Sequence, residues 1–181
     1  MLQSGLGVPP WDVLHQGLAL QLGLTVGIWS IIVSFLVLLM WLPLKERYGI
    51  GTLLNAVVIG VMIDVTALVL PEAGNTWIAG VMLTFGILLI GLASGLYIGA
   101  NLGPGPRDGL MTALARRGLS IRVTRWLLEI VVLVVGWLLG GTFGIGTVTF
   151  ALLIGPIVQF FLQRWTIHTG HPEDAWDHPA R

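Results

Sequence analysis

Three polar side chains lie inside otherwise apolar stretches of this chain and could carry chemistry in a membrane. Asp64 and Asn55 occupy one such stretch, and Gln159 occupies another. A charge near the centre of a bilayer costs about 2.5–3.5 kcal/mol on insertion scales, so ionisable groups there tend to face a protein interior. Because desolvation favours the protonated form of a carboxyl group, Asp64 is a candidate proton or cation site. The alternative is a wetted carboxylate close to the outer interface.

Asn55 and Gln159 are placed so that they could line the same path as Asp64. Asn55 precedes Asp64 by nine residues, about two and a half helical turns, so the two share a helix face. Gln159 occupies the equivalent position in the second half of the chain. All three are candidate substrate-binding residues. Interhelical hydrogen bonds are the alternative role for the two amides.

Two Gly-Ile-Gly-Thr turns could bind an anionic group. The glycines permit a tight turn, the threonine can cap the helix that follows, and a helix N-terminus exposes unpaired N–H groups. Close helix packing through the glycines is the alternative explanation. The residues concerned are Gly49, Gly51, Thr52, Gly144, Gly146 and Thr147.

A Pro-Gly-Pro-Arg-Asp turn ending at Asp108 could hold a further charged group. Its Arg107 is a candidate ligand for an anionic substrate or a lipid headgroup, with positive-inside anchoring as the alternative. Asp108, like Asp12 in the related turn near the N-terminus, is well placed to cap a short helix. Glu129 is also a candidate substrate-binding residue, and its alternative is an ion pair with Arg125 or Arg107.

Helices must position these residues, because five segments reach the length of about 20 mostly apolar residues that a spanning helix needs. Two shorter stretches follow the Pro-rich turns and are too short to cross, so we expect interfacial or re-entrant half-helices there. The fold class is therefore all-α and integral to the membrane. The five spans are roughly Gly27–Leu44, Gly51–Leu70, Trp77–Ala100, Arg122–Gly140 and Gly146–Gln163, and the half-helices are Trp11–Leu22 and Arg107–Arg117.

Composition agrees with a membrane protein. Charged residues make up 10% of the 181-residue chain, against about 25% in soluble domains, and the mean hydropathy is +0.90. Zero net charge argues against nucleic acid as a partner. We expect no cofactor and no metal, since the chain has no cysteine and the three histidines of its polar tail have no fixed scaffold.

The basic residues predict the orientation. If the five segments cross the bilayer, all nine Lys and Arg residues fall on one face, which should be cytoplasmic. The opposite face holds Asp12, His15 and Glu72. The N-terminus is therefore expected outside and the C-terminus inside.

The chain repeats itself at an offset of about 95 residues. Residues 6–14 return as 102–110 with five of nine positions identical, and the twelve residues from Gly49 match those from Gly144 at seven positions. Three predicted spans separate Asp12 from Asp108, so the repeat is inverted and its equivalent motifs lie on opposite membrane faces. The pairing expected from this symmetry is the first Pro-rich turn with Gly144–Thr147, and the second with Gly49–Thr52. We expect one domain with repeat one at about 5–70, repeat two at about 77–163 and a polar cytoplasmic tail at 164–181.

The two repeats are unequal. A whole predicted span precedes the second Pro-rich turn, whereas five residues precede the first. We expect one N-terminal helix to be missing, through truncation or a downstream start codon, or to be replaced by contacts with a second chain.

The run Leu102–Met111, the run Trp137–Gly141 and the two Gly-Ile-Gly-Thr turns resemble the bacterial YczE/YyaS/YitT membrane proteins. The resemblance covers about residues 5–163. It implies a multi-pass protein of the bacterial cytoplasmic (inner) membrane with a six-span pattern, from which this chain lacks the first helix. It implies little about chemistry.

The leading hypothesis is a secondary transporter that moves a small solute at the interface of two inverted repeats. Asp64, Asn55 and Gln159 would line the path, and Glu129 and Arg107 would guard its inner mouth. The alternative is a non-transporting scaffold or regulatory protein that acts through lipid or a protein partner. A membrane enzyme is not expected, because the chain has no thiol nucleophile and shows no His–carboxylate arrangement at helical spacing. Glycines spaced by four permit tight packing, including a homodimer.

Overall fold

The computed structural model describes residues 1–44, 49–99, 103–115, 117–118 and 120–165, and in these ranges every regular element is a helix. The seven α-helices fall on the seven predicted segments, with ends shifted by a few residues. A short 3₁₀ helix, η1, precedes them. The elements are η1 (Leu2–Ser4), α1 (Pro10–Leu22), α2 (Val26–Leu44), α3 (Ile50–Val69), α4 (Thr76–Gly99), α5 (Pro106–Ala115), α6 (Ile121–Leu138) and α7 (Ile145–Trp165).

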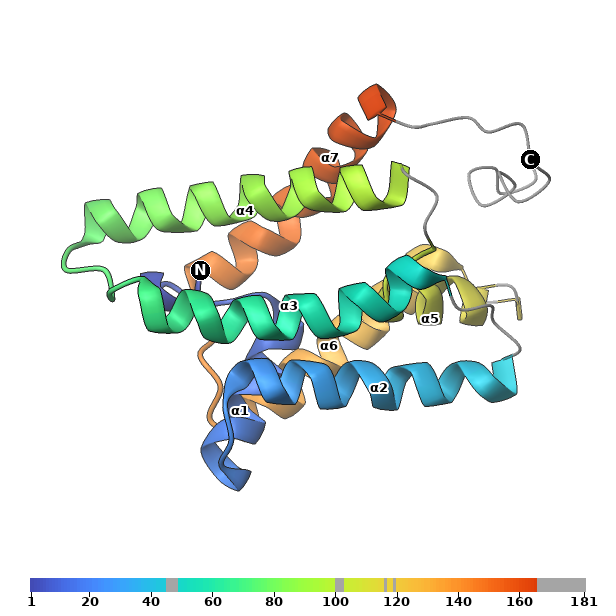
Figure 1. Ribbon diagram of the computed structural model, residues 1–181, viewed down its shortest axis with the longest axis horizontal. Coiled ribbons are helices and arrows are strands. Elements are labelled where there is room, and N and C mark those ends of the chain that lie inside the picture. The colour runs from blue at the N-terminus through green and yellow to red at the C-terminus, as the bar shows by residue number, and fades with distance from the viewer. Residues whose placement is uncertain (45–48, 100–102, 116, 119, 166–181) are drawn as a thin grey trace.

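The two short helices lie toward opposite ends of α2 (Figure 1). Helix α2 packs on α3, and α4 packs on α7. Helix α1 packs against α6 and α2, near the start of α2, while α5 packs against the same two helices near the far end of α2 (Figure 1). The short helices therefore approach a shared pair of long helices from opposite ends.

The two short helices start in the same way. Each has a proline in its first turn, Pro10 in α1 and Pro106 in α5, where the missing N–H and the fixed φ are tolerated. Helix α1 ends before Gly23, whose φ of 75° an L-residue adopts with difficulty. With 13 and 10 residues, the helices measure about 20 and 15 Å. Neither crosses a hydrocarbon core of about 30 Å.

Glycines let the helices approach closely. A Cβ atom built on Gly60 of α3 would lie 2.5 Å from the carbonyl oxygen of Gly27 in α2. In the α1–α6 pair, a Cβ on Gly17 would lie 2.6 Å from the carbonyl oxygen of Gly136. The buried apolar core lies between α1, α2 and α5, with contributions from α3 and α6. Its members are Trp11, Val33, Val37, Leu38, Trp41, Ala56, Leu110 and Val132.

Three described helices are long and apolar enough to cross a membrane, namely α2, α3 and the Thr76–Tyr97 part of α4. Helix α6 has 18 residues, of which three are charged, and the apolar part of α7, Ile145–Phe161, is shorter. A helical membrane protein is thus supported, while the number of five spans stays a prediction. Helix α7 extends two residues into the predicted tail, and residues 166–181 lie outside the described ranges.

Candidate functional site

The first turns of α1 and α5 meet in the interior. The guanidinium carbon of Arg107 lies 4.9 Å from the centre of the Trp11 ring, within range of a cation–π interaction. Each residue is the second of its helix, and the two occupy equivalent positions of the predicted repeat. Trp11 is only 6% exposed. Two half-helices that enter from opposite ends and meet at their N-termini fit the re-entrant interpretation better than the interfacial one.

This contact corrects the predicted separation of the two turns. Asp12 and Arg107 were assigned to opposite membrane faces, which are about 30 Å apart across the hydrocarbon core. The structure places Arg107 against the residue next to Asp12. The sequence placed the motifs by loop order alone and could not show that both helices turn inward.

A histidine–carboxylate pair lies at the same place, on α1. The Nδ1 atom of His15 lies 3.1 Å from Oδ1 of Asp12, three residues earlier. His15 is completely buried, whereas the side chain of Asp12 is 19% exposed. The prediction that no His–carboxylate arrangement exists at helical spacing was wrong, because three residues is one turn of a helix.

The charges of this cluster influence one another. Burial opposes ionisation of Asp12, but the hydrogen bond with His15 and the charges of His15 and Arg107 outweigh it and lower the pKa of the carboxyl group. Burial lowers the pKa of His15, and Arg107 adds to this effect while Asp12 opposes it. Burial also lowers the pKa of Arg107, against the charges of Asp12 and Asp108. At neutral pH these shifts favour an ionised Asp12 and a neutral His15, and an arginine such as Arg107 stays charged in proteins.

Two buried polar atoms of α1 have no hydrogen-bond partner among the described residues. They are Nε2 of His15 and Nε1 of Trp11. The two residues are four apart, so they share one face of the helix. A buried polar atom without a partner costs free energy and calls for an explanation.

A second polar group surrounds the turn before α5. The hydroxyl of Tyr97 donates to Oδ2 of Asp108 at 2.9 Å. A Cβ atom built on Gly105 would lie 3.0 Å from the Tyr97 hydroxyl and 3.4 Å from Oδ1 of Asn55. Of the predicted lining residues, Asn55 is thus the one that lies beside the α5 turn, and Gly105 leaves the space between these groups open.

The Gly-Ile-Gly-Thr turns pack against the Pro-rich turns in the predicted pairs. The hydroxyl of Thr52 donates to the carbonyl of Pro104 at 2.7 Å. At the other end, the N–H of Gly146 donates to the carbonyl of Leu6 at 2.7 Å. The N–H of Gly146, which we predicted could bind an anion, therefore already donates to the carbonyl of Leu6. This supports the alternative explanation of close packing.

The threonines cap differently from the prediction. Helices α3 and α7 begin at Ile50 and Ile145, so each threonine is the third helical residue. The hydroxyl of Thr52 accepts a hydrogen bond from the N–H of Gly49 at 3.3 Å, and Thr147 does the same for Gly144 at 3.3 Å. This is the side-chain half of a capping box.

Asp12 and Asp108 also differ from the predicted caps. Both are the third residue of their helices, after Pro10 and Pro106. Their carboxylates bind His15 and Tyr97 respectively. No side-chain cap is recorded at the start of α1, where Pro9 is the N-cap.

The carboxylate of Asp64 accepts hydrogen bonds from the start of α2. Its Oδ1 accepts from the N–H of Gly27 at 2.8 Å, and its Oδ2 accepts from the Thr25 hydroxyl. A carboxylate at a helix N-terminus satisfies an otherwise unpaired N–H and is favoured by the helix dipole. Asp64 is thus engaged with α2, whereas Asn55 faces the α5 turn, and the structure does not bring the two together.

The remaining predicted site residues lie apart from this cluster. Glu129 pairs with Arg125 at 3.1 Å, which is the ion pair given as its alternative role. Gln159 is exposed on α7. The two polar groups instead include three residues that the sequence did not indicate as site residues: Trp11 and His15 in the first, and Tyr97 in the second. The signals for the first two were the equivalence of Trp11 to Arg107 and the spacing of His15 from Asp12; Tyr97 had none.

Trp41, near the end of α2, contacts the start of α5. It is completely buried, and its indole N–H donates to the carbonyl of Pro106 at 3.1 Å. The ring packs where a side chain on Gly109 would lie, 2.0 Å from the nearest ring carbon. Trp41 therefore anchors the first turn of α5 to α2.

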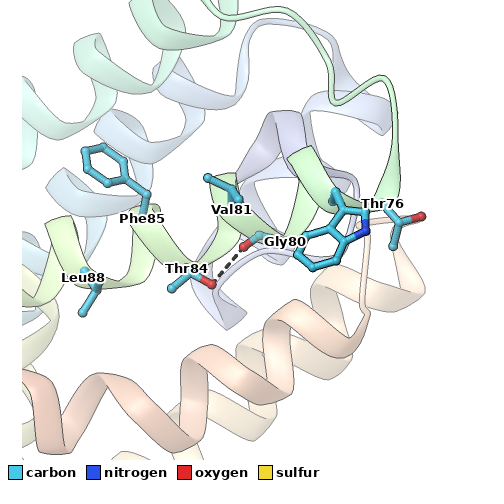
Figure 2. A pocket seen from close by; sticks show the side chains of 7 residues that line it. Thr76, Gly80, Val81, Thr84, Phe85 and Leu88 are labelled. Atoms are coloured by element: carbon cyan, nitrogen blue, oxygen red, sulfur yellow. Dashed lines mark hydrogen bonds between the residues drawn. The ribbon is translucent and has the colours of Figure 1, made fainter.

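An open apolar groove runs along one face of α4 (Figure 2). Its polar atoms are few, and the Thr84 hydroxyl is already bound to the carbonyl of Gly80 at 2.9 Å. Such a face suits lipid and offers no chemistry. The groove is lined by Thr76, Trp77, Gly80, Val81, Thr84, Phe85 and Leu88.

Known proteins place this chain among uncharacterised relatives. It is 48% identical over 160 residues to an uncharacterized protein of Haemophilus influenzae, covering 88% of this chain and 73% of that protein. It is 39% identical over 161 residues to the uncharacterized membrane protein YczE of Bacillus subtilis, covering 88% and 75%, and 33% identical over 172 residues to YyaS of the same organism, covering 89% and 83%. No solved structure matches. Residues 1–163 match a family of unknown function, DUF6198. The resemblance to YczE and YyaS is confirmed, and the chain is a membrane protein that belongs to the DUF6198 family.

Proposed function

We propose that this protein is a secondary transporter that moves a small polar or anionic solute past the junction of α1 and α5. The observation that carries the proposal is the contact of Arg107 with Trp11 at the meeting point of the two half-helices. Discontinuous or short helices that meet inside a membrane protein are the usual site of solute binding in secondary transporters.

The ionisable groups at this junction support the proposal. Arg107 interacts electrostatically with Asp12, His15 and Asp108. Ionisable residues inside a membrane protein are expensive and usually serve a path for ions or solutes. Helix N-termini add partial positive charge on both sides of the junction. Arg107, Trp11 and Asn55 would bind the solute, and Asp64 and Glu129 would maintain the scaffold.

The proposed architecture is an inverted repeat with five spans, the N-terminus outside and the C-terminus in the cytoplasm of a bacterial inner membrane. The matched close approaches of Gly7 to Thr147 and of Gly103 to Thr52 support the repeat. The basic residues support the orientation. Under this proposal the protein acts without chemical catalysis, and a homodimer is not required, because both half-helices come from one chain.

Ligand binding tests the proposal. Purified protein is heated with a panel of inorganic anions, amino acids, organic acids and sugars, and its unfolding midpoint is recorded. A ligand at 100 times its Kd stabilises the folded state by about 2.7 kcal/mol. We expect at least one stabilising solute, with the effect lost in Arg107→Gln and retained in Arg164→Gln, since Arg164 lies on the exposed side of α7. Stabilisation by no member of the panel would favour the scaffold alternative.

A further inference from the structure

We propose that His15 binds and releases a proton, with Nε2 as the acceptor atom and Asp12 as the group that holds the ring in the accepting tautomer. The proposal deepens the proposed function by naming the coupling ion. Proton binding by His15 does not depend on transport, but its role as the coupling ion rests on the proposed function.

Asp12 determines the tautomer of the ring. An ionised carboxylate can only accept hydrogen bonds, so Nδ1 of His15, 3.1 Å from Oδ1, must carry the hydrogen. In a neutral imidazole the other nitrogen then presents a lone pair. Nε2 is therefore an acceptor, and its orientation is fixed by a side chain of the same helix.

The environment of Nε2 makes it the reactive end of the pair. The atom is buried and has no hydrogen-bond partner among the described residues. A water-borne proton that reaches it would occupy the lone pair and form an imidazolium, while Nδ1–H stays bound to Asp12. Release to water reverses the step and restores the neutral ring, so that no other co-reactant is needed.

The charges around His15 act on its protonation in opposite directions. Asp12 on its own helix favours the charged ring, and Arg107 on α5 disfavours it. Of the other helices packed against α1, α2 carries no titratable residue, and the described charged side chains of α6, Arg125 and Glu129, pair with each other. Burial and Arg107 therefore oppose protonation of the ring, while Asp12, which itself interacts with the N-terminal amine, favours it.

This arrangement gives a physical coupling between proton and solute. An anionic solute at Arg107 would offset the positive charge that disfavours protonation of His15. Solute binding would then favour proton binding, and by linkage the proton would favour the solute to the same extent. The expected coupling has the sign of a proton–anion symport.

Nitrogen NMR of the imidazole tests the proposal in the full-length protein. The other histidines are His168, His171 and His178, so replacing these three by glutamine leaves His15 as the single labelled histidine. We expect the Nδ1–H tautomer at neutral pH and reversible protonation of Nε2 at a pH below the ordinary histidine pKa of about 6.5. The midpoint should rise in Arg107→Gln and fall in Asp12→Asn.

Two results would overturn the proposal. One is the Nε2–H tautomer at neutral pH, and the other is a ring that stays neutral down to the pH of unfolding. If Arg107→Gln fails to fold, Arg107→Lys is measured in its place. Because lysine keeps the positive charge, the titration midpoint of His15 should then stay near that of the wild type. Titration of His15 without any solute flux would defeat only the proposed transport, whereas flux without titration would defeat only the proton site.

Discussion

Gly7 packs directly against Thr147: a Cβ atom built on the glycine would lie 2.8 Å from the threonine hydroxyl oxygen. Gly103 has the same relationship to Thr52, at 2.9 Å, and the two glycines have φ angles of 109° and 104°. No L-side chain fits either position without strain. Each glycine thus allows a Pro-rich turn to lie on the start of a long helix.

Replacing Gly7 or Gly103 by alanine should therefore destabilise the fold strongly. Backbone strain of about 1–2 kcal/mol adds to a steric clash of about 1–3 kcal/mol. The measurement is the unfolding midpoint of each purified variant. Gly5→Ala is the matched control, because Gly5 has a φ of 67° but nothing within 4 Å of the added atom. Equal losses at Gly5 and Gly7 would show that packing on Thr147 contributes nothing.

The Arg107–Trp11 contact should stabilise more than an exposed contact of the same kind. Cation–π pairs contribute about 0.5–1 kcal/mol at exposed sites and about 2 kcal/mol when desolvated. We expect Arg107→Gln to cost about 2 kcal/mol and Arg164→Gln, which removes an exposed pair with Phe160 at 4.6 Å, to cost less than 1 kcal/mol. Chemical unfolding of the two variants provides the comparison, and a smaller loss at Arg107 would contradict it.

Asp64 should act on stability through the start of α2. Asp64→Ala leaves the N–H of Gly27 and the Thr25 hydroxyl without this acceptor, at a cost of about 1–2 kcal/mol. Asp64→Asn should lose less, because an amide oxygen can still accept from Gly27. Thr66→Val, on the same helix, removes a hydroxyl bonded within α3 and should change little. If Asp64→Asn has normal stability but no transport, the result would instead support a role for Asp64 in the solute path.

Stability should depend on pH through His15. Its pKa is lowered in the folded protein, so protonation below the ordinary value of about 6.5 disfavours the folded state. The contribution is fully present above that pH and declines as the pH falls toward the folded pKa. Asp12, whose pKa is also lowered, loses its contribution only below about pH 4. The unfolding midpoint from pH 8 to pH 5 should fall in the wild type and less in His15→Asn. Parallel curves would refute the assignment.

Local features of the sequence predicted the helices well. Helix positions follow from signals that lie close together in the chain. These signals are the lengths of the apolar segments, the prolines Pro10 and Pro106, and the glycine turns. The site was predicted less well because its groups come from different helices. Arg107 and Trp11 meet only because α1 and α5 both turn inward, and Asp64 reaches Gly27 only through the α2–α3 crossing.

The assignment of His15 illustrates the same limit. Its spacing from Asp12 was visible in the sequence and should have indicated a pair. Complete burial and the absence of a described partner for Nε2 depend on α2 and α6 packing over α1. A lone histidine in an apolar segment gives no warning of either property.

Flux through the protein tests the central proposal most directly. Protein reconstituted in liposomes would be supplied with the radiolabelled solute that stabilises it most, and uptake would be compared for wild type, Arg107→Gln and Arg164→Gln. Uptake above that of protein-free liposomes, abolished in Arg107→Gln and unchanged in Arg164→Gln, is the predicted result. Wild-type uptake equal to that of empty liposomes, or uptake indifferent to Arg107, would contradict transport at the α1–α5 junction.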